Sequence, residues 1–339
     1  MNTLGYEDVR RSTMPKPLSI QAIGEVVKTV NGYGDSLILD DKKQLYHQGT
    51  GHVFGQNRFF TPLKTDPVKD FDCDKTNLVY MNDAGEVFES HVVEKAYQFK
   101  KVELPFPAKF VSSGSHFCLA VVEDELKTER VYIWGDRKQC EPSISMSRKI
   151  PENRQVMELE KLGALIADQK SSVKKIRTVD KGVVILLENG HVITWGENQS
   201  GNLGVPRSEY SLIHCSVSTP ASPLALNNLD IKVTDFALSS NLLVLLSDKG
   251  EAYYCGINQH LKIEAVPFFP GRKVKAIGCN FNYFYLQDDK GTWFANRAFE
   301  DQELVKFYGS VNLVEVETEQ FGERVIREIS GKYENAFAI

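Results

Sequence analysis

The segment over residues 186–204, LLENGHVITWGENQSGNLG, constrains the fold more than any other part of the sequence. Its apolar start leads into an Asn-Gly pair, and a second run rich in β-branched residues ends at Trp195 and Gly196. Because Asn and Gly accept the positive φ angles that a tight two-residue turn requires, the pattern predicts a β-hairpin. A glycine-rich connection then runs to Gly204 and completes one unit of structure.

Weaker copies of this pattern recur at intervals of tens of residues. They lie at residues 37–49, 78–88, 118–135, 242–256, 283–294 and 325–339. A further short apolar piece precedes several of them, at residues 26–30, 173–176, 231–236 and 274–277. Such a period is typical of repeat proteins, in which neighbouring units bury one another's apolar faces. Three or four strands per unit, repeated about seven times, predict an all-β seven-bladed propeller.

On these residues the chain resembles the family of the regulator of chromosome condensation, whose repeats form a seven-bladed propeller. The family repeat has an acidic-Gly turn, a strand that ends in Trp-Gly, and then Asn, Gly and Leu-Gly, and residues 190–204 match it almost throughout. The resemblance implies structural roles in the repeat, with the tryptophans ending equivalent strands, for Trp134, Gly135, Gly190, Trp195, Gly196, Gly201, Gly204, Gly250, Gly256, Gly291 and Trp293. The other copies are degenerate, since Gly49 follows a Gln and residues 294–296 lack the Gly.

A chain of 339 residues with 42% apolar residues can bury a sizeable core, and propellers of this length form one unit. We therefore expect a single propeller domain over residues 1–339, with inserts at about 141–172, 208–229 and 300–323. In the first insert, Val156, Leu159, Leu162 and Ile166 have helical spacing and predict a short amphipathic helix on the propeller rim. The second contains prolines and is expected to be irregular, and the third is as compatible with strand as with coil. Both family length variation and partner contact would explain the inserts.

The composition argues against several classes of ligand. A net charge of −5 gives no reason to expect nucleic acid as a direct ligand, because phosphate binding requires clustered Lys and Arg. Six cysteines are scattered without metal-ligand spacing, so we expect structural thiols, no metal and no cofactor. The chain start has no secretory core and no run reaches transmembrane length, which predicts a cytoplasmic or nuclear protein away from the membrane.

The motifs that could in principle bind phosphate or catalyse a reaction are better explained by structural roles. Residues 196–204 are rich in glycine but lack the Lys-Ser/Thr ending of a phosphate-binding loop. His116 lies between Ser113 and Cys118, without the surrounding glycines of a nucleophile elbow, so a hydrogen-bonding role is favoured over catalysis. We therefore do not expect an enzyme.

Three functions from different classes remain, and a fold by itself does not choose among them. The first is a protein-protein interaction scaffold or a regulatory subunit of a larger assembly. The resemblance adds two more: guanine-nucleotide exchange on a small GTPase such as Ran, and binding to nucleosomes. By the family's repeat, the positions at the channel mouth, where a protein partner would bind, are held by Asp35, His116, Asn241, Asn282 and Glu334. Asp35 stands there in place of the family's His.

The two ends of the chain supply incomplete repeats. In the family, the first and last segments combine to complete one blade, which removes an exposed sheet edge. Here residues 325–339 provide about two strands, and the N-terminus begins near the end of a repeat. We therefore expect a seventh blade that is formed jointly by the two ends and is either short or completed by strands from another chain.

Overall fold

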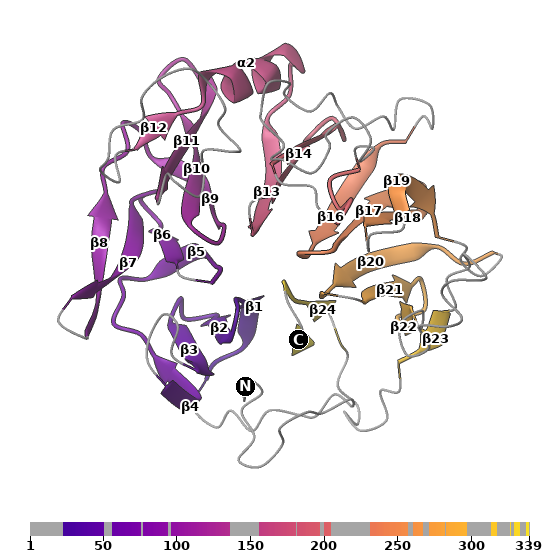
Figure 1. The fold of residues 1–339 in the computed structure, drawn as a ribbon, viewed down its shortest axis with the longest axis horizontal. Coiled ribbons are helices and arrows are strands. Elements are labelled where there is room, and N and C mark those ends of the chain that lie inside the picture. Colours follow the sequence, from indigo (N-terminus) through magenta and orange to yellow (C-terminus); the bar gives the residue numbers. More distant parts are fainter. Residues whose placement is uncertain are drawn as a thin grey trace.

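Short antiparallel strands are almost all of the regular secondary structure in the described part of the computed structural model, and their sheets follow one another around a central axis (Figure 1). Every sheet pairs strands that are consecutive in the sequence. The seven sheets are the blades of a β-propeller, as the repeats predict. The structure describes residues 23–50, 56–75, 77–93, 96–135, 156–180, 182–196, 200–204, 231–256, 260–266, 271–281, 283–296, 313–316, 326, 329–332 and 337–338.

The first three blades each have four strands. Blade 1 consists of β1 (Val26–Asn31), β2 (Asp35–Asp40), β3 (Leu45–Thr50) and β4 (Gln56–Pro62). Blade 2 consists of β5 (Val68–Cys73), β6 (Leu78–Asn82), β7 (Val87–Val93) and β8 (Ala96–Val102). Blade 3 consists of β9 (Ala108–Ser113), β10 (Phe117–Glu123), β11 (Glu129–Gly135) and β12 (Met157–Glu158).

The remaining blades have between two and four described strands. Blade 4 consists of β13 (Val173–Val179), β14 (Gly182–Leu187) and β15 (Val192–Gly196). Blade 5 consists of β16 (Val233–Leu238), β17 (Leu242–Ser247), β18 (Ala252–Gly256) and β19 (His260–Ala265). Blade 6 consists of β20 (Val274–Cys279), β21 (Phe284–Asp288), β22 (Trp293–Asn296) and β23 (Leu313–Glu315). Blade 7 consists of β24 (Ile329–Ser330) and β25 (Phe337–Ala338).

The first strand of most blades carries a bulge near its start. The register of β1 against β2 shifts between Val26 and Lys28, and that of β13 against β14 shifts between Val173 and Lys175. Blades 2, 5 and 6 have the same irregularity at the same place. A bulge bends its strand and increases the local twist. Its recurrence shows that the copies share one backbone geometry even where their sequences have diverged.

The core lies between the blades, because the second strand of several blades, such as β2, β14 and β17, is covered on both faces. In β14 and β17 every residue is buried, and these strands read as continuous apolar runs rather than alternating ones. Leu37 and Leu39 of blade 1 pack against Phe71 and Leu78 of blade 2, and corresponding clusters join the following blades. Each blade therefore buries a face that it could not hide alone.

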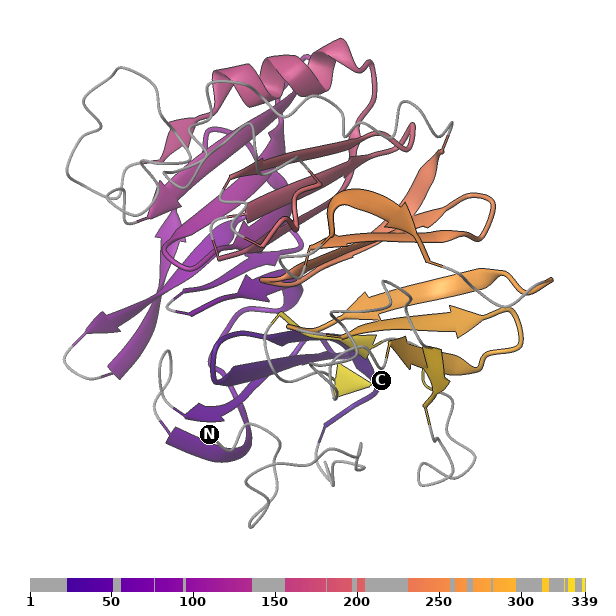
Figure 2. The same cartoon turned by 45° about the vertical axis from the view of Figure 1, so that its right-hand side comes forward.

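The helix predicted in the first insert is present as α2 (Glu160–Asp168). Leu162 and Ile166 are buried in the cluster between blades 3 and 4, and Leu159 packs beside them. Figures 1 and 2 show the helix along the outer edge of the ring, above β11 and β13. Part of the third insert forms β23, the outer strand of blade 6. Residues 141–155, the whole of the insert at 208–229 and most of the third insert lie outside the described residues.

The described part of blade 7 comes from the C-terminal segment alone. Its strands β24 and β25 pair with each other. Ile329 and Ile326 pack with Trp293 of blade 6, which seats the segment against its neighbour. Residues 1–22, which were predicted to contribute to this blade, lie outside the described residues. The expectation that both ends of the chain complete it stays a prediction.

The register corrects the position predicted for one tryptophan. Trp134 and Trp195 lie opposite equivalent residues of their second strands, Cys118 and Val183. Trp293 instead begins β22, and Asn296 occupies the equivalent position, opposite Phe284. All three tryptophans are nevertheless buried. Trp293 packs in a different place, where its Nε1 donates a hydrogen bond to the carbonyl oxygen of Ile326 at 3.0 Å.

The glycines predicted to mark the repeat all have a positive φ. The angles are 133° at Gly135, 90° at Gly190, 113° at Gly196, 77° at Gly201, 71° at Gly204, 77° at Gly250, 118° at Gly256 and 89° at Gly291. Two features disfavour a side chain at Gly256. One is its positive φ, and the other is that a Cβ atom would lie 1.9 Å from the carbonyl oxygen of Asn241. Hence this glycine lets the end of β18 pass close to the start of β17.

The substitution Gly256→Ala is expected to lower the free energy of unfolding by about 2–4 kcal/mol, because it adds a backbone clash to an unfavourable φ. Gly271→Ala is the matched control, since Gly271 has a φ of 77° but no atom within 4 Å of a Cβ. The control should cost only about 1 kcal/mol. Urea unfolding followed by circular dichroism measures both, and equal losses would show that the clash contributes nothing.

Candidate functional site

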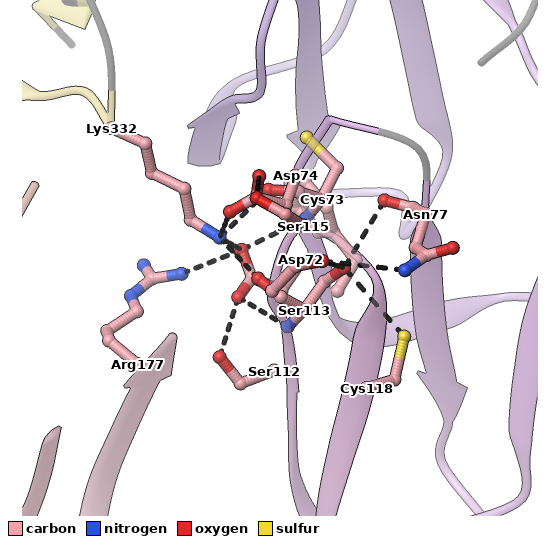
Figure 3. Close-up of polar contacts among 12 residues, drawn as sticks. Asp72, Cys73, Asp74, Asn77, Ser112, Ser113, Ser115, Cys118, Arg177 and Lys332 are labelled. Atoms are coloured by element: carbon pink, nitrogen blue, oxygen red, sulfur yellow. Dashed lines mark hydrogen bonds and ion pairs between the residues drawn. The ribbon is translucent and has the colours of Figure 1, made fainter. Parts of the chain in front are cut away.

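Polar side chains from several blades meet near the propeller axis, where the first strands converge. The fifth residue of the first strand, counted from its start, is Asp72 in β5, Ser112 in β9 and Arg177 in β13. Lys332 reaches them from the segment after β24 (Figure 3). We call Asp72, Asp74, Arg177 and Lys332 the axial cluster. It joins blades 2, 4 and 7.

Lys332 is buried, with 4% of the residue exposed. Its Nζ lies 2.8 Å from Oδ1 of Asp72 and donates to the carbonyl oxygens of Cys73 at 2.8 Å and Ser113 at 2.9 Å. Oδ2 of Asp74 lies farther away, at 3.9 Å. An ammonium has three N–H donors, so the three short contacts satisfy it completely. A buried charge is tolerated when it is paired and hydrogen-bonded in this way.

Asp72 receives hydrogen bonds from blade 3 as well as from the cations. Its Oδ2 accepts from the hydroxyl of Ser112 at 2.7 Å and from the amide of Ser113 at 2.9 Å. Its Oδ1 also lies 3.4 Å from Nη1 of Arg177. Burial by itself would raise the pKa of Asp72, but the positive charges of Lys332, Arg177 and Lys28 outweigh it and hold the pKa below its ordinary value. Asp72 is therefore the anionic centre of the cluster.

A second group of polar contacts lies beside the axial cluster, in the turns that follow the first strands. Asp180 pairs with Lys75 and accepts from the hydroxyl of Ser115 at 2.9 Å, while its amide donates to Oδ2 of Asp74 at 3.2 Å. Burial opposes ionisation of Asp180, yet the hydrogen bond and charge of Lys75 leave its pKa lowered. The pKa of Lys75 is raised, because these same contacts with Asp180 exceed the effect of its own burial. Blades 2, 3 and 4 are thus joined at one end of the axis.

Two lysines clamp neighbouring blades in the same manner. Lys28 of β1 pairs with Asp70 of β5 and donates to the carbonyl oxygen of Phe71 at 2.7 Å, with its Nζ 5.0 Å from the Phe71 ring centre. Lys175 repeats the arrangement between blades 4 and 5. Its partners are the carboxylate of Asp235 at 2.6 Å, and the carbonyl oxygen and ring of Phe236 at 2.7 Å and 4.9 Å. The equivalent bulges give Lys28 and Lys175 equivalent places, so the same contact forms at two junctions.

The residues predicted to bind a partner lie in different settings. Asp35 is buried in blade 1, where Nε2 of His47 lies 2.8 Å from its Oδ1, and its Oδ2 accepts no hydrogen bond from the described residues. His116 is half-buried in the turn before β10. Asn241 is half-buried and accepts from the hydroxyl of Ser200 at 2.7 Å. Asn282 and Glu334 lie outside the described residues. The binding role of all five positions stays a prediction.

His116 and Asn241 lie in turns that connect the first strand of a blade to the second, and Asp35 begins β2 directly after the equivalent turn of blade 1. They therefore lie at the same end of the propeller, together with Tyr33, Lys75 and Asp180. Of the five predicted positions, His116 and Asn241 lie at this end and are partly accessible, whereas Asp35 is buried. We call the described residues of the turns over 32–34, 74–75, 114–116 and 239–241, together with Asn77 and Asp180, the channel-mouth face.

The buried thiols lack the environment of nucleophiles. Burial raises the pKa of Cys73 and Cys118 well above the ordinary range, and it raises the pKa of Cys255 and Cys279 to about 12. Across the described ranges, no three His, Cys, Asp or Glu side chains are grouped as ligands for a metal ion. Among the helices that the structure describes, none has the length and apolar character needed to cross a membrane.

Sequence reasoning missed the axial cluster, although the first strands carried a signal. Asp72 lies between the apolar residues Phe71 and Cys73, and Arg177 follows Ile176, and a charge that is buried beside such residues requires a partner. Nothing local identifies that partner, because Lys332 is 259 residues away from Cys73 in the sequence. Only the closed ring brings them together.

The substitution Asp72→Asn is expected to lower the free energy of unfolding by about 3 kcal/mol, because it leaves Lys332 buried without its closest counter-charge. Asp83→Asn is the matched control, since Asp83 pairs with Lys43 on the surface and is 58% exposed. It should change stability by less than about 0.5 kcal/mol. Chemical denaturation of the two variants measures the difference, and a loss below about 1 kcal/mol for Asp72→Asn would contradict the role given to the cluster.

The lowered pKa values of Asp72 and Asp180 predict that acid destabilises the protein. Between the folded pKa and the ordinary value of 3.8, the unfolded chain binds more protons than the folded one. The stabilisation that Asp72 and Asp180 contribute is therefore complete at pH values above the ordinary pKa. It is lost as the pH falls through the lower pKa of the folded state. Urea titrations from about pH 7 down to about pH 3 should show this loss, with a shallower slope in Asp72→Asn, and identical slopes would be the contrary result.

Comparisons with known proteins identify the fold and leave the family open. No protein-family model matches the sequence, and no curated protein matches it. Among solved structures, human WBSCR16 is similar at 14% identity, with 96% of this chain and 88% of that chain covered and a TM-score of 0.68. Yeast RCC1 (Prp20), in its complex with Kap60, is 12% identical over 91% of this chain and 78% of that chain, with a TM-score of 0.67.

A second structure of Prp20p, from Saccharomyces cerevisiae, has 14% identity and a TM-score of 0.65, and covers 92% of this chain and 82% of that chain. At these identities the likeness shows the fold alone. The chain therefore has an RCC1-like β-propeller fold, and membership of the repeat family stays a prediction.

Proposed function

We propose that this protein is a non-enzymatic interaction scaffold, acting as a regulatory subunit of a larger protein assembly in the cytoplasm or nucleus. The observation that carries the proposal is the contrast between its axis and its channel-mouth face. At the axis, the charges are buried and neutralise one another. At the face, polar and aromatic groups on a rigid support are open to contact, as in a binding surface rather than a reaction centre.

The channel-mouth face carries side chains suited to a protein partner. Tyr33 is 42% exposed, and Nζ of Lys75 lies 5.7 Å from its ring centre. An aromatic ring next to a cation is a frequent centre of binding energy in protein interfaces. His116 and Asn241 lie at the same end of the ring and add hydrogen-bonding groups that are partly accessible. The supporting turns of blades 2, 3 and 4 are tied to one another through Asp180, so this part of the surface is held in shape.

The buried chemistry supports a binding role over catalysis. The described thiols are covered and have raised pKa values, and Asp72, at the centre of the axial cluster, is matched by two cations. A catalytic acid or nucleophile instead needs access to a substrate and a pKa adjusted to its task.

The structural relatives support protein partners in general. Prp20 is bound to Kap60 in one structure, and Prp20p has binding properties to Gsp1p and histones. This likeness makes guanine-nucleotide exchange on a small GTPase the second candidate, and histone binding the third. The shared fold does not transfer these partners, so they enter as outcomes of the experiment.

The test is purification of the tagged protein from cell extract at physiological salt, followed by mass spectrometry of the proteins retained. Tyr33→Ala should reduce recovery of the main partner at least about tenfold, because an exposed aromatic anchor of an interface contributes more than about 1.4 kcal/mol. Leu126→Ser is the matched control, since Leu126 is 84% exposed in the β10–β11 turn at the opposite end of the blades. It should retain the partner.

Two results would contradict the proposal. Loss of the partner in Leu126→Ser and not in Tyr33→Ala would place binding at the opposite end of the propeller. Faster release of a fluorescent GDP analogue from small GTPases, in the presence of the purified protein, would replace the scaffold with an exchange factor.

A further inference from the structure

The oxygen atoms around Lys332 form a small cage that belongs to blades 2 and 3, whereas the ammonium inside it belongs to blade 7. The cage consists of Oδ1 of Asp72 and the carbonyl oxygens of Cys73 and Ser113, all within 2.9 Å of Nζ (Figure 3). We infer that blades 2 and 3 form a binding site for a primary ammonium group, which Lys332 occupies as an internal ligand.

The cage is held in shape by contacts that do not involve Lys332. Asp72 is fixed by Ser112 and Ser113 through its Oδ2 and by its bond from the amide of Cys73 at 3.0 Å. Asp74 is fixed by Ser115 at 3.2 Å and by the amide of Asp180 at 3.2 Å. The two carbonyl oxygens belong to the ends of β5 and β9, whose register is set by strand pairing. The site is therefore pre-organised for its ligand.

The geometry selects an ammonium over other cations. Three acceptors at 2.8–2.9 Å match the three N–H donors of a primary ammonium. A guanidinium spreads its donors in a flat fork, which suits the two oxygens of one carboxylate rather than three separate acceptors. Calcium requires six to eight oxygen ligands at about 2.3–2.6 Å, and the three cage oxygens fall short of that number. Asp74, at 3.9 Å, adds negative charge without taking a donor.

The site holds the last blade in position. The carbonyl oxygen of Lys332 accepts hydrogen bonds from the amide of Ser240 at 3.2 Å and from its hydroxyl at 3.3 Å, in blade 5. One residue therefore connects blade 7 with blades 2 and 3 through its side chain and with blade 5 through its backbone. The ammonium group of Lys332 is the part of this connection that a small molecule can replace.

The experiment is chemical rescue of the full-length Lys332→Ala variant. Removal of the ammonium should lower the melting temperature by about 5 °C, because it leaves the carboxylates of the cage without their cation. Added n-propylammonium chloride replaces the atoms removed by the substitution and should restore at least half of this loss. We expect saturation at roughly 1–100 mM, since a ligand of so few atoms binds weakly even in a good site.

Controls separate site binding from general effects of salt. Sodium chloride and tetramethylammonium chloride at the same concentrations should not restore the melting temperature, because neither supplies N–H donors. The wild-type protein should not respond to propylammonium, since its cage is occupied. Rescue should disappear in Lys332→Ala/Asp72→Asn and persist in Lys332→Ala/Asp83→Asn, where the exposed carboxylate is changed instead.

Each result decides the question in one direction. Saturable rescue by propylammonium, absent with tetramethylammonium and without Asp72, supports the site. Equal effects of all three salts, or a folded Lys332→Ala variant that does not respond, would overturn it. If Lys332→Ala does not fold, the yield of folded protein after dilution from urea is measured with and without propylammonium, and an unchanged yield would likewise refute the inference.

Discussion

The structure depends on the burial of a lysine at the point where the blades converge. Apolar packing explains how each blade holds its neighbour, but it does not by itself join blades that are not adjacent. Lys332 makes that connection, because its charge requires partners wherever it is buried, and those partners come from blades 2 and 3. The same requirement orients Asp72 and brings Arg177 toward the axis. Electrostatic pairing thus joins blades that are not adjacent, whereas hydrophobic contact between neighbouring blades supplies most of the stability.

The repeat supplies a common backbone on which different contacts are placed. A bulge at the start of the first strand recurs in blades 1, 2, 4, 5 and 6, and it gives Lys28 and Lys175 the same relation to the next blade. The two lysines contact the same kinds of groups, a carboxylate, a carbonyl oxygen and an aromatic ring. These pairs occur in two places although the surrounding sequences differ. The repeated unit is therefore the geometry, and the residues at its variable positions determine how each junction is made.

The sequence predicted those features that depend on neighbouring residues. Hairpins, repeat number and the helix at Glu160–Asp168 follow from local turn chemistry and periodicity, and they are present. The position predicted for Trp293 is wrong, because the end of the strand is set by the number of residues after the turn and not by the aromatic residue. Trp195 and Cys255 lie five residues after Gly190 and Gly250, and the same count from Gly291 leads to Asn296. The axial cluster was missed for a different reason, since its members are brought together by ring closure and no local pattern encodes that.

Closing the ring through Lys332 has a consequence for the order of events during synthesis. The oxygen atoms that receive the lysine belong to residues made 259 and 219 positions earlier. Blades 2 and 3 are therefore synthesised long before Lys332. Until then, the carboxylates of Asp72 and Asp74 have no contact with its ammonium group. Contacts between such distant residues form late, because a long loop must first be closed. The nascent protein therefore remains an open arc until Lys332 has been synthesised.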